Sequence, residues 1–417
     1  MGRGPECPLG RIGRVQGSDA APESDAGAVP PLNGVVVADF SRVLAGPLAT
    51  MTLSDLGARV IKIERPGGGD DTRAWGPPYA DGSGLTTYFE SVNRGKASIA
   101  LDLSDPGDRA RAAEIIARSD VLVENFRPGE FARLGFGWDV LSARHPRLIY
   151  ASISGFGTAG GAELPGYDFV AQALGGLMHV TGEAEGAPVK AGVALVDVLT
   201  GKDAVIGILA ALRRREHTGT GSRIEVSLLS SLQASLVNQV SAVLGSGVEP
   251  RRLGNRHPSI APYETLRCAD GPLAVACGND AQFARMAEAV GSPGLALDPR
   301  FATNADRVAN RPALVTTLQA ALATADAATW AARLNAVGVA AGVVQTIGEG
   351  LELAERLGLA PIVETTGRDG RVSRQVRPPI VWTPPVAPPA AAPPHLDGHG
   401  AQIRAWLAEP RPHEEDR

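Results

Sequence analysis

The stretch LNGVVVADFSRVLAGPLATMTLSDLGARVIKIERPG, residues 32–67, decides the fold of this chain. Its first part, 32–40, is a short run rich in β-branched residues, which predicts a buried strand. An amphipathic helix follows over 48–58 and ends at a glycine cap, and a second strand is predicted over 59–67. Strand, helix and strand at this spacing form a βαβ unit, which implies a parallel sheet.

The same alternation continues along the chain. Apolar, strand-like runs recur at 96–103, 120–126 and 147–157, and helical patterns lie between them at 104–119 and 127–146. The sequence therefore predicts an α/β fold whose large domain is Rossmann-like and doubly wound.

The domain boundaries follow from changes in composition. Residues 1–31 are rich in Gly, Pro, Ala and charge, without the apolar core of a signal peptide, and are expected to form a disordered leader. The large α/β domain is expected over 32–230, completed by 346–417. A linker helix and a smaller α+β domain, with a hairpin at a Asp-Gly turn, are expected over 231–345. Residues 376–394 are rich in proline and predict an extended connector.

Composition excludes several classes of protein. The 417 residues are 44% hydrophobic and 20% charged, as in soluble globular proteins, and the net charge of −5 gives no reason to expect nucleic acid or an anionic membrane as a partner. No segment holds the roughly 18 uninterrupted apolar residues of a membrane span, so a cytoplasmic location is expected. The three cysteines form no CxxC pair or Cys/His cluster, so no metal site is expected.

Side chains suited to a phosphorylated ligand follow the predicted strands. Ligands of such sheets bind at the carboxyl ends of the strands. The residues there are Ser41, Arg42 and Val43, then Glu64 and Arg65, Leu101 and Asp102, and Asn125 and Phe126. Arginine donates two parallel hydrogen bonds to phosphate, although either arginine could instead be an ordinary surface or ion-pair residue. The first turn lacks the G-x-G-x-x-G pattern, which argues against a dinucleotide.

One acidic residue stands among apolar neighbours in the stretch 166–212. Asp197 follows Ala-Leu-Val and precedes Val-Leu, which predicts a buried strand meeting a helix. A carboxylate placed there loses water, so it should be paired, capping or catalytic. The residues alone leave two roles open for Asp197: an N-cap of the following helix, or a nucleophile.

In this order, the motifs resemble those of the class III CoA-transferases, the CaiB/BaiF family. The matching segments are LNGVVVADFSRVLAGP, DLGARVIKIERPGGGDDTR, NRGKASIALDL, DVLVENFRPG, GYDFVAQALGG, the Asp197 segment and GILAALRRREHTGTGSRIEVSLL, and the resemblance covers most of residues 32–405. It implies a CoA-binding large domain, a smaller domain, and a homodimer in which two ring-like chains interlock. It also implies Asp197 as the nucleophile, acyl-CoA and a small carboxylic acid as substrates, and no permanently bound cofactor.

The resemblance also implies which residues contact coenzyme A. These contacts come from the loop after the first strand, from the segments VENF and GYD, and from single residues that would bind phosphate or adenine. They are Arg42, Val43, Ala45, Arg65, Leu101, Asn125, Phe126, Arg133, Tyr167 and Asp168. For Asp168, a turn or capping acid is the alternative role.

Two features distinguish branches of the family. The racemase branch carries a histidine where this chain has Tyr167, and racemisation needs a proton-transfer group on each face of the α-carbon, so CoA transfer is favoured. The segment RLGNRHPSIAPYE resembles the succinyl-CoA:dicarboxylate branch, including the glutarate-accepting enzyme, rather than the formate or oxalate branch. Arg251, Arg252 or Arg256 could pair with a distal carboxylate, and His257 could touch the substrate; surface and structural roles are the alternatives. A racemase or epimerase and a non-catalytic CoA-binding paralogue stay open as other functions.

Overall fold

The chain folds around one six-stranded sheet, as the computed structural model of residues 29–80, 84–387 and 391–410 describes. The strand order is β3-β2-β1-β4-β5-β6, and every neighbouring pair is parallel. This is the order of the doubly wound Rossmann-like sheet that the sequence predicts. The strands are β1 (Val36–Asp39), β2 (Arg59–Glu64), β3 (Lys96–Ala100), β4 (Val121–Glu124), β5 (Ile149–Ser154) and β6 (Ser222–Ser227).

Helices cover both faces of this sheet because its strands are apolar on both sides. Val37 and Val123 face one core, which α1 (Ala45–Asp55) and α7 (Leu195–Thr218) complete. Ala38 and Leu122, one position along, face the other core, with α3 (Pro106–Ala117), α4 (Trp138–Arg144) and α15 (Gly400–Ala408). Near-continuous β-branched runs are what a sheet buried on both faces requires.

Shorter elements connect these layers. They are η1 (Asp71–Ala74), α2 (Thr87–Ser91), η2 (Ala132–Phe136), α5 (Asp168–Leu174), α6 (Leu177–Val180), α8 (Leu228–Ser235) and α9 (Val237–Ser246). The last two correct the expectation of one long linker helix: Val237 has a positive φ of 39°, which a continuous α-helix does not allow, so the chain turns between α8 and α9.

A second group of elements builds an α+β body around a core of its own. The antiparallel sheet β7-β8-β9 contains β7 (Tyr263–Arg267), β8 (Pro272–Ala276) and β9 (Ala340–Val343), and the first two form the hairpin predicted at the Asp-Gly turn. The helices are α10 (Asp280–Ala289), η3 (Pro293–Leu297), α11 (Asn304–Ala309), α12 (Arg311–Leu322) and α13 (Ala327–Ala336). Leu273, Phe283 and Trp330 are among the residues that fill this core.

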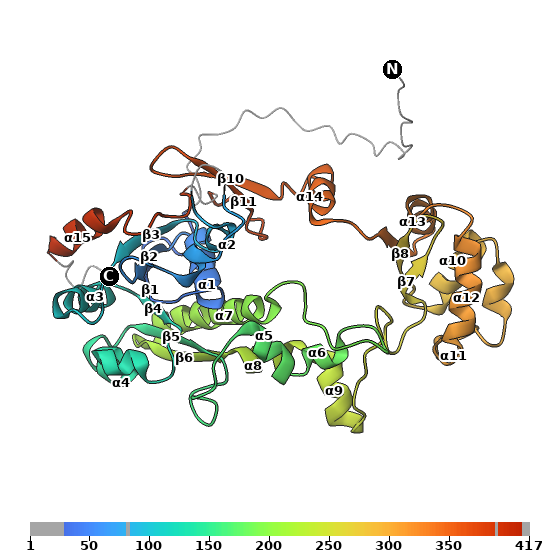
Figure 1. Cartoon of the computed structure of the whole chain (residues 1–417), viewed down its shortest axis with the longest axis horizontal. Coiled ribbons are helices and arrows are strands. Elements are labelled where there is room, and N and C mark those ends of the chain that lie inside the picture. Colours follow the sequence, from blue (N-terminus) through green and yellow to red (C-terminus); the bar gives the residue numbers. More distant parts are fainter. Residues whose placement is uncertain (1–28, 81–83, 388–390, 411–417) are drawn as a thin grey trace, which may run out of the picture.

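The C-terminal part of the chain returns to the large sheet. After α14 (Ile347–Arg356) and the hairpin of β10 (Ile362–Thr366) and β11 (Val372–Val376), residues 397–399 run along the edge strand β3. Asp397 accepts a hydrogen bond from the Ala100 amide (2.9 Å), and the His399 amide donates to the Ser98 carbonyl (3.0 Å). Figure 1 shows two separate connections to the α+β body, one running on from α9 and one carrying α14, so that the chain outlines an open ring.

Some expectations fall on residues that the structure does not describe. The leader expected over 1–31 lies outside the described residues up to residue 28, whereas Pro30 packs against Gly57 and its carbonyl accepts the Asn33 amide (3.0 Å). The Pro-rich connector has no strand or helix over its described residues after β11. Among the described helices, none is both long and apolar enough to cross a membrane.

Candidate active site

A pocket of about 210 Å³ opens at the carboxyl ends of β1 to β4. Seven of the fifteen residues that line it are ones that the sequence places at these strand ends, since parallel strands all end at the same edge. Those lining it are Phe40, Ser41, Arg42, Lys62, Ile63, Glu64, Arg65, Gly69, Asp70, Leu101, Asp102, Leu103, Ser104, Phe126 and Leu134. Arg42 lies over the Phe126 ring at 5.6 Å, and both Arg42 and Arg65 pair with Asp71. The pocket thus joins two cations to an apolar ring, as a nucleotide with phosphates requires.

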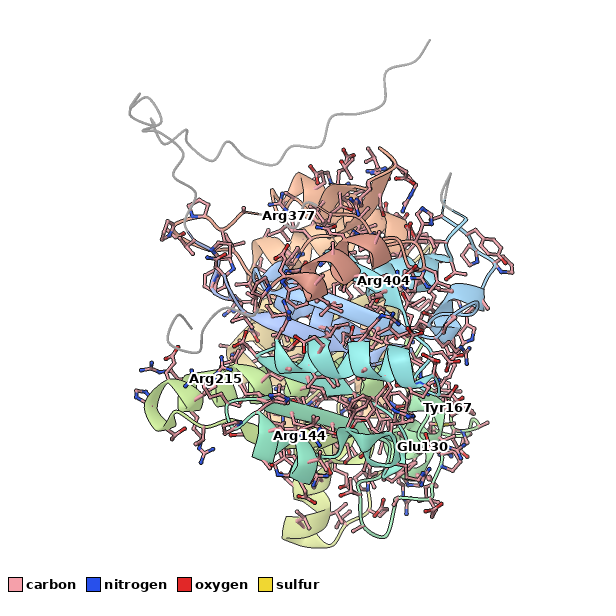
Figure 2. The ribbon with its side chains drawn as sticks, turned by 90° about the vertical axis from the view of Figure 1, so that its left-hand side faces the viewer. Glu130, Arg144, Tyr167, Arg215, Arg377 and Arg404 are labelled. Atoms are coloured by element: carbon pink, nitrogen blue, oxygen red, sulfur yellow. The ribbon has the colours of Figure 1, made fainter. Side chains whose placement is uncertain are left out.

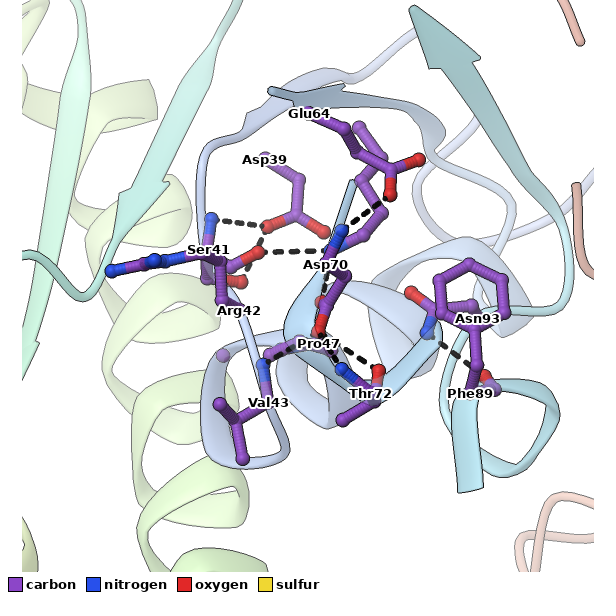
Figure 3. A network of polar contacts seen from close by, with 12 residues as sticks. Asp39, Ser41, Arg42, Val43, Pro47, Glu64, Asp70, Thr72, Phe89 and Asn93 are labelled. Atoms are coloured by element: carbon purple, nitrogen blue, oxygen red, sulfur yellow. Dashed lines mark hydrogen bonds and ion pairs between the residues drawn. The ribbon is translucent and has the colours of Figure 1, made fainter. Parts of the chain in front are cut away.

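The loop from Ser41 to Val43 is clamped from two sides, of which Figure 3 shows the one formed by Asp70. Asn125 accepts the Arg42 amide (2.9 Å) and donates to the Arg42 carbonyl (2.8 Å). Asp70 accepts the Val43 amide at 3.2 Å. Val43 has a φ of 71°, an unfavourable conformation for a β-branched residue, so these bonds hold a strained backbone at the pocket rim.

Two fully buried lysines support this loop from below. Lys62 pairs with Asp70 (2.9 Å) and donates to the Ser41 carbonyl (2.9 Å), and Lys96 pairs with Asp39 (3.1 Å). Burial disfavours the charge on Lys62, but the carboxylates of Asp70 and Asp39 outweigh it and raise the pKa of this lysine. Burial likewise acts against the Asp70 carboxylate, whose pKa is nevertheless lowered, chiefly by Lys62. The rim of the pocket therefore rests on a charged, dehydrated network.

Glu64 is the residue that a dinucleotide site would use for the ribose. Its carboxylate instead accepts two bonds from Arg73, both at 2.7 Å, and one from Ser98 at 2.6 Å. Because Glu64 is buried and fully engaged, it offers no free oxygen to a ribose hydroxyl. This agrees with the absence of the glycine pattern from the turn after β1.

Asp197 lies in the first turn of α7, which corrects the expectation of a strand in this stretch. The helix begins at Leu195, so the apolar run before Asp197 is already helical or capping backbone. A short apolar run does not distinguish a strand from a buried helix start, which is why the sequence misled here. Asp197 is also not the N-cap of α7, because the N-cap is Ala194, three residues earlier.

Asp168, at the start of α5, provides the cap instead. Its Oδ1 accepts the backbone amides of Val196 (2.7 Å) and Asp197 (3.2 Å), and its Oδ2 accepts from the buried amide of Gln172 (2.6 Å). This confirms the capping role that the sequence left open for Asp168. The first amides of α7 are thereby used by Asp168 and are not available to Asp197.

The Asp197 carboxylate is a partly buried acid without a hydrogen-bond donor among the described residues. Burial, together with the nearby charge of Asp168, raises the pKa of Asp197 to about 7 from an ordinary value of 3.8. Tyr88 of α2 lies near both acids: burial and the charges of Asp197 and Asp168 raise its pKa to about 12. A partly desolvated, unpaired carboxylate of this kind is a reactive oxygen nucleophile once it is ionised.

A close helix contact connects Asp197 with the pocket. Gly201 is one turn beyond Asp197 on the same face of α7, and a Cβ at Gly201 would lie 2.7 Å from the Ala45 carbonyl oxygen. Ala45 begins α1, directly after the clamped loop at the pocket rim. The clamped loop and the start of α1 therefore lie between the pocket and the Asp197 carboxylate.

The structure does not bring every predicted contact residue to the pocket. Ala45 packs against α7, Asn125 holds the loop, and Arg133 is largely exposed and pairs with Glu130 at 3.8 Å. Tyr167 and Asp168 belong to the neighbourhood of Asp197; Figure 2 shows Tyr167 at the surface on the side opposite Arg215, the far end of α7.

The basic segment of the linker donates hydrogen bonds to backbone carbonyls, one of them in α6. Arg252 donates to the His179 carbonyl (3.2 Å), and Arg256 donates to the Leu253 carbonyl (2.9 Å). His257 accepts the Ser259 amide (3.1 Å), and its ring lies tilted against the Tyr263 ring with the centroids 5.1 Å apart. These are the structural roles that the sequence left as alternatives.

Sequence reasoning missed several residues of the site. Lys62 stands between apolar neighbours in β2, as Asp197 does in its own segment. The same pattern could therefore have identified Lys62. Asp70, Tyr88 and Gln172 lie in short segments without periodicity, and only their long-range partners reveal them. Local pattern does not encode such pairings.

Two substitutions of Asp168 distinguish its role as the cap of α7 from the effect of its negative charge on Asp197. Asp168→Asn keeps an acceptor for the helix amides but removes the negative charge, so the pKa of Asp197 should fall and the acidic limb of the rate profile should move to lower pH. Asp168→Ala should also lose about 1 kcal/mol of stability with the cap. Measuring kcat against pH, and the unfolding midpoint, tests both; an unchanged acidic limb in Asp168→Asn would contradict this coupling.

Proteins of known family resemble this chain over most of its length. The family model described as CoA-transferase family III matches residues 32–400. The chain is 42% identical to the acetyl-CoA:oxalate CoA-transferase of Acetobacter aceti over 384 residues, which is 91% of this chain and 96% of that one. It is also 42% identical to the succinate–glutarate CoA-transferase of Agrobacterium fabrum over 386 residues, with 91% and 96% covered.

A solved structure agrees over nearly the whole molecule. The crystal structure of a CaiB/BaiF family protein from Brucella suis superposes with a TM-score of 0.81 at 41% identity, covering 90% of this chain and 99% of that one. The parallel six-stranded sheet and the separate small antiparallel sheets are thus those of a known fold.

Proposed function

The chain belongs to CoA-transferase family III and is a CoA-transferase, and from this premise we propose that it moves coenzyme A from an acyl-CoA, succinyl-CoA by preference, to a dicarboxylic acid through a covalent bond to Asp197. The observation that supports this is the Asp197 carboxylate itself. It is partly buried, without a donor among the described residues, and one loop away from the pocket at the strand ends. The names of the relatives at 42% identity support the acceptor class, since oxalate and glutarate are both dicarboxylates.

The proposed reaction consists of balanced acyl exchanges. A carboxylate oxygen of Asp197 attacks the thioester carbonyl of the donor, the C–S bond breaks, and a mixed anhydride and the CoA thiolate result. The thiolate then attacks the Asp197 carbonyl carbon, the anhydride C–O bond breaks, and the donor acid leaves as a carboxylate. Asp197 now holds CoA as a thioester, so the energy of the original bond is kept.

The acceptor acid reverses these two steps. Its carboxylate attacks the aspartyl thioester, which releases the CoA thiolate and forms a second mixed anhydride. The thiolate attacks the acceptor carbonyl, which gives the new acyl-CoA and restores the Asp197 carboxylate. No proton is gained or lost overall, and each oxyanion can be stabilised by backbone amides of the glycine-containing loop before α7.

Coenzyme A would be held by residues on two sides of the clamped loop. Arg42 and Arg65 would bind phosphate oxygens, and Leu101 and Phe126 would contact the adenine. Asn125 and Asp70 would keep Val43 and Ala45 at the passage through which the pantetheine arm reaches Asp197.

The test of this function is exchange together with trapping. Succinyl-CoA and a panel of acids should give new acyl-CoA species, and mass spectrometry during turnover should find a CoA adduct on the peptide that contains Asp197. Epimerisation of a 2-methylacyl-CoA without exchange would favour the racemase alternative. Binding of CoA with neither activity would favour a non-catalytic paralogue.

We also propose that two chains interlock as a homodimer. A largely apolar groove of about 1110 Å³ runs between α1, α7 and residues 371–382, and exposed apolar side chains such as Ile206 (65% exposed) and Val376 (63% exposed) line it. Apolar surface of this extent is typical of an interface between subunits. Sedimentation equilibrium should give twice the mass of one chain, and Ile206→Glu should weaken the association. A monomer at micromolar concentration would contradict this assembly.

A further inference from the structure

The neighbourhood of Asp197 is acidic, which is a difficulty for an acidic substrate. Asp168 lies close enough for its charge to raise the pKa of Asp197, and no cation contributes to the raised pKa of Asp197. A dicarboxylic acid brings two more negative charges to this place. Only one of its carboxylates takes part in the exchange, so the distal one needs a cation to offset repulsion and desolvation.

We propose that Lys190 binds the distal carboxylate of the acid exchanged at Asp197 and thereby sets the preference for dicarboxylic acids; this inference rests on the proposed function. Lys190 is the sole lysine or arginine between Arg147 and Lys202 in the sequence. Its segment runs directly into the first turn of α7, which carries Asp197.

The backbone beside Lys190 is fixed relative to Asp197 by one face of α5. Gln172 accepts the Ala191 amide at 2.8 Å, and Asp168 accepts the Val196 and Asp197 amides. Gln172 and Asp168 are four residues apart on the helix, so their anchoring points lie about 5–6 Å apart. Gln172 is fully buried and also donates to Asp168 at 2.6 Å, which makes the support rigid.

The segment between the two residues carries only small side chains and has open space beside Gly192. The four residues from Ala191 to Ala194 include no side chain larger than valine, and a Cβ added at Gly192 would meet nothing within 4 Å. The carboxyl carbons of an extended five-carbon diacid are about 5 Å apart, and the flexible four-carbon stem of lysine adapts to such a span.

The ammonium of Lys190 is also free to bind an anion. Lys190 is exposed, and within the described part of the chain it forms no ion pair; its Nζ donates only to the carbonyl of the adjacent Ala191, at 3.1 Å. Arg252 and Arg256 also donate to backbone carbonyls, that of His179 in α6 and that of Leu253 in the linker. Because its one bond is to the adjacent residue, Lys190 can turn to a substrate without releasing another element of the fold.

The test compares two acceptors of equal length, glutarate and pentanoate, with one donor. In a ping-pong mechanism kcat/KM for the acceptor reports its own half-reaction, so donor effects cancel. Lys190→Met should lower kcat/KM for glutarate by about 10- to 100-fold, the usual worth of a charge-assisted hydrogen bond, and leave pentanoate within about twofold. Lys190→Arg should restore most of the glutarate activity, and Arg213→Met, at the far end of α7, should change neither.

The outcomes separate this inference from the proposed function. Equal losses for both acids, no loss for either, or a wild type without preference for glutarate would overturn the role of Lys190. A selective loss in Arg252→Met with normal Lys190→Met would overturn it too, because the linker would then hold the distal carboxylate. Failure of the proposed function would look different: the wild type would exchange no CoA and form no adduct.

Discussion

Asp197→Asn is expected to abolish CoA transfer, lowering kcat by about 10⁴-fold or more, because an amide cannot form the anhydride or release CoA again. The CoA adduct on the peptide containing this position should disappear as well. Binding of CoA should survive, since the pocket at the strand ends is built from other residues. Transfer that persists at more than about a hundredth of the wild-type rate would exclude the covalent route.

The same substitution has a consequence for stability. The pKa of Asp197 is raised to about 7 in the folded chain from 3.8, so the native state holds this proton more tightly than the unfolded state. The stabilisation is complete below pH 3.8, is lost as the pH rises, and is gone above pH 7. Asp197→Asn does not titrate, and it should therefore unfold at a higher temperature than the wild type at pH 8.

The pH dependence supplies the control for that comparison. The two proteins should have similar unfolding temperatures near pH 4, and the wild-type rate should rise from pH 6 to pH 8 as the nucleophile ionises. An Asp197→Asn variant less stable than the wild type at pH 8 would show that the carboxylate is paired rather than desolvated.

Lys62→Met should cost about 3–5 kcal/mol of stability, because it leaves the buried Asp70 carboxylate without its partner. Asp70 also accepts the Val43 amide, so the strained loop at the pocket rim should relax and KM for acyl-CoA should rise. Urea unfolding and initial rates against acyl-CoA concentration measure the two effects.

A matched pair of variants tests the cause. Arg213→Ala breaks an exposed ion pair with Glu216 and should change stability by about 0.5 kcal/mol or less. The double variant Lys62→Met/Asp70→Asn removes both buried charges and should recover part of the loss. If Lys62→Met unfolded no earlier than Arg213→Ala, the buried pair would not support the loop.

The sheet could be predicted from sequence because its information is local. Apolar runs such as residues 35–38 favour a strand covered on both faces, and parallel strands bring their carboxyl ends to one edge. This is why residues as distant in the chain as Arg42, Leu101 and Phe126 were expected together and line one pocket.

What the sequence could not show depends on contacts at long range. The helical start around Asp197 follows from its cap, which comes from Asp168 some 29 residues earlier. The buried pairing of Lys62 with Asp70 requires the turn into η1, and the break between α8 and α9 requires the backbone of Val237. The periodicity of hydrophobic residues carries no information about any of these three features.

The run of residues 397–399 along β3 has a consequence for the assembly of the interlocked dimer. If the rings interlock as proposed, one chain must pass through the ring of its partner before that ring closes. The hydrogen bonds of residues 397–399 to Ser98 and Ala100 are what closes each ring. Threading would then have to precede this final docking. Folding and pairing would be a single, concentration-dependent event, and a chain that completed itself in isolation would be barred from its partner by topology alone.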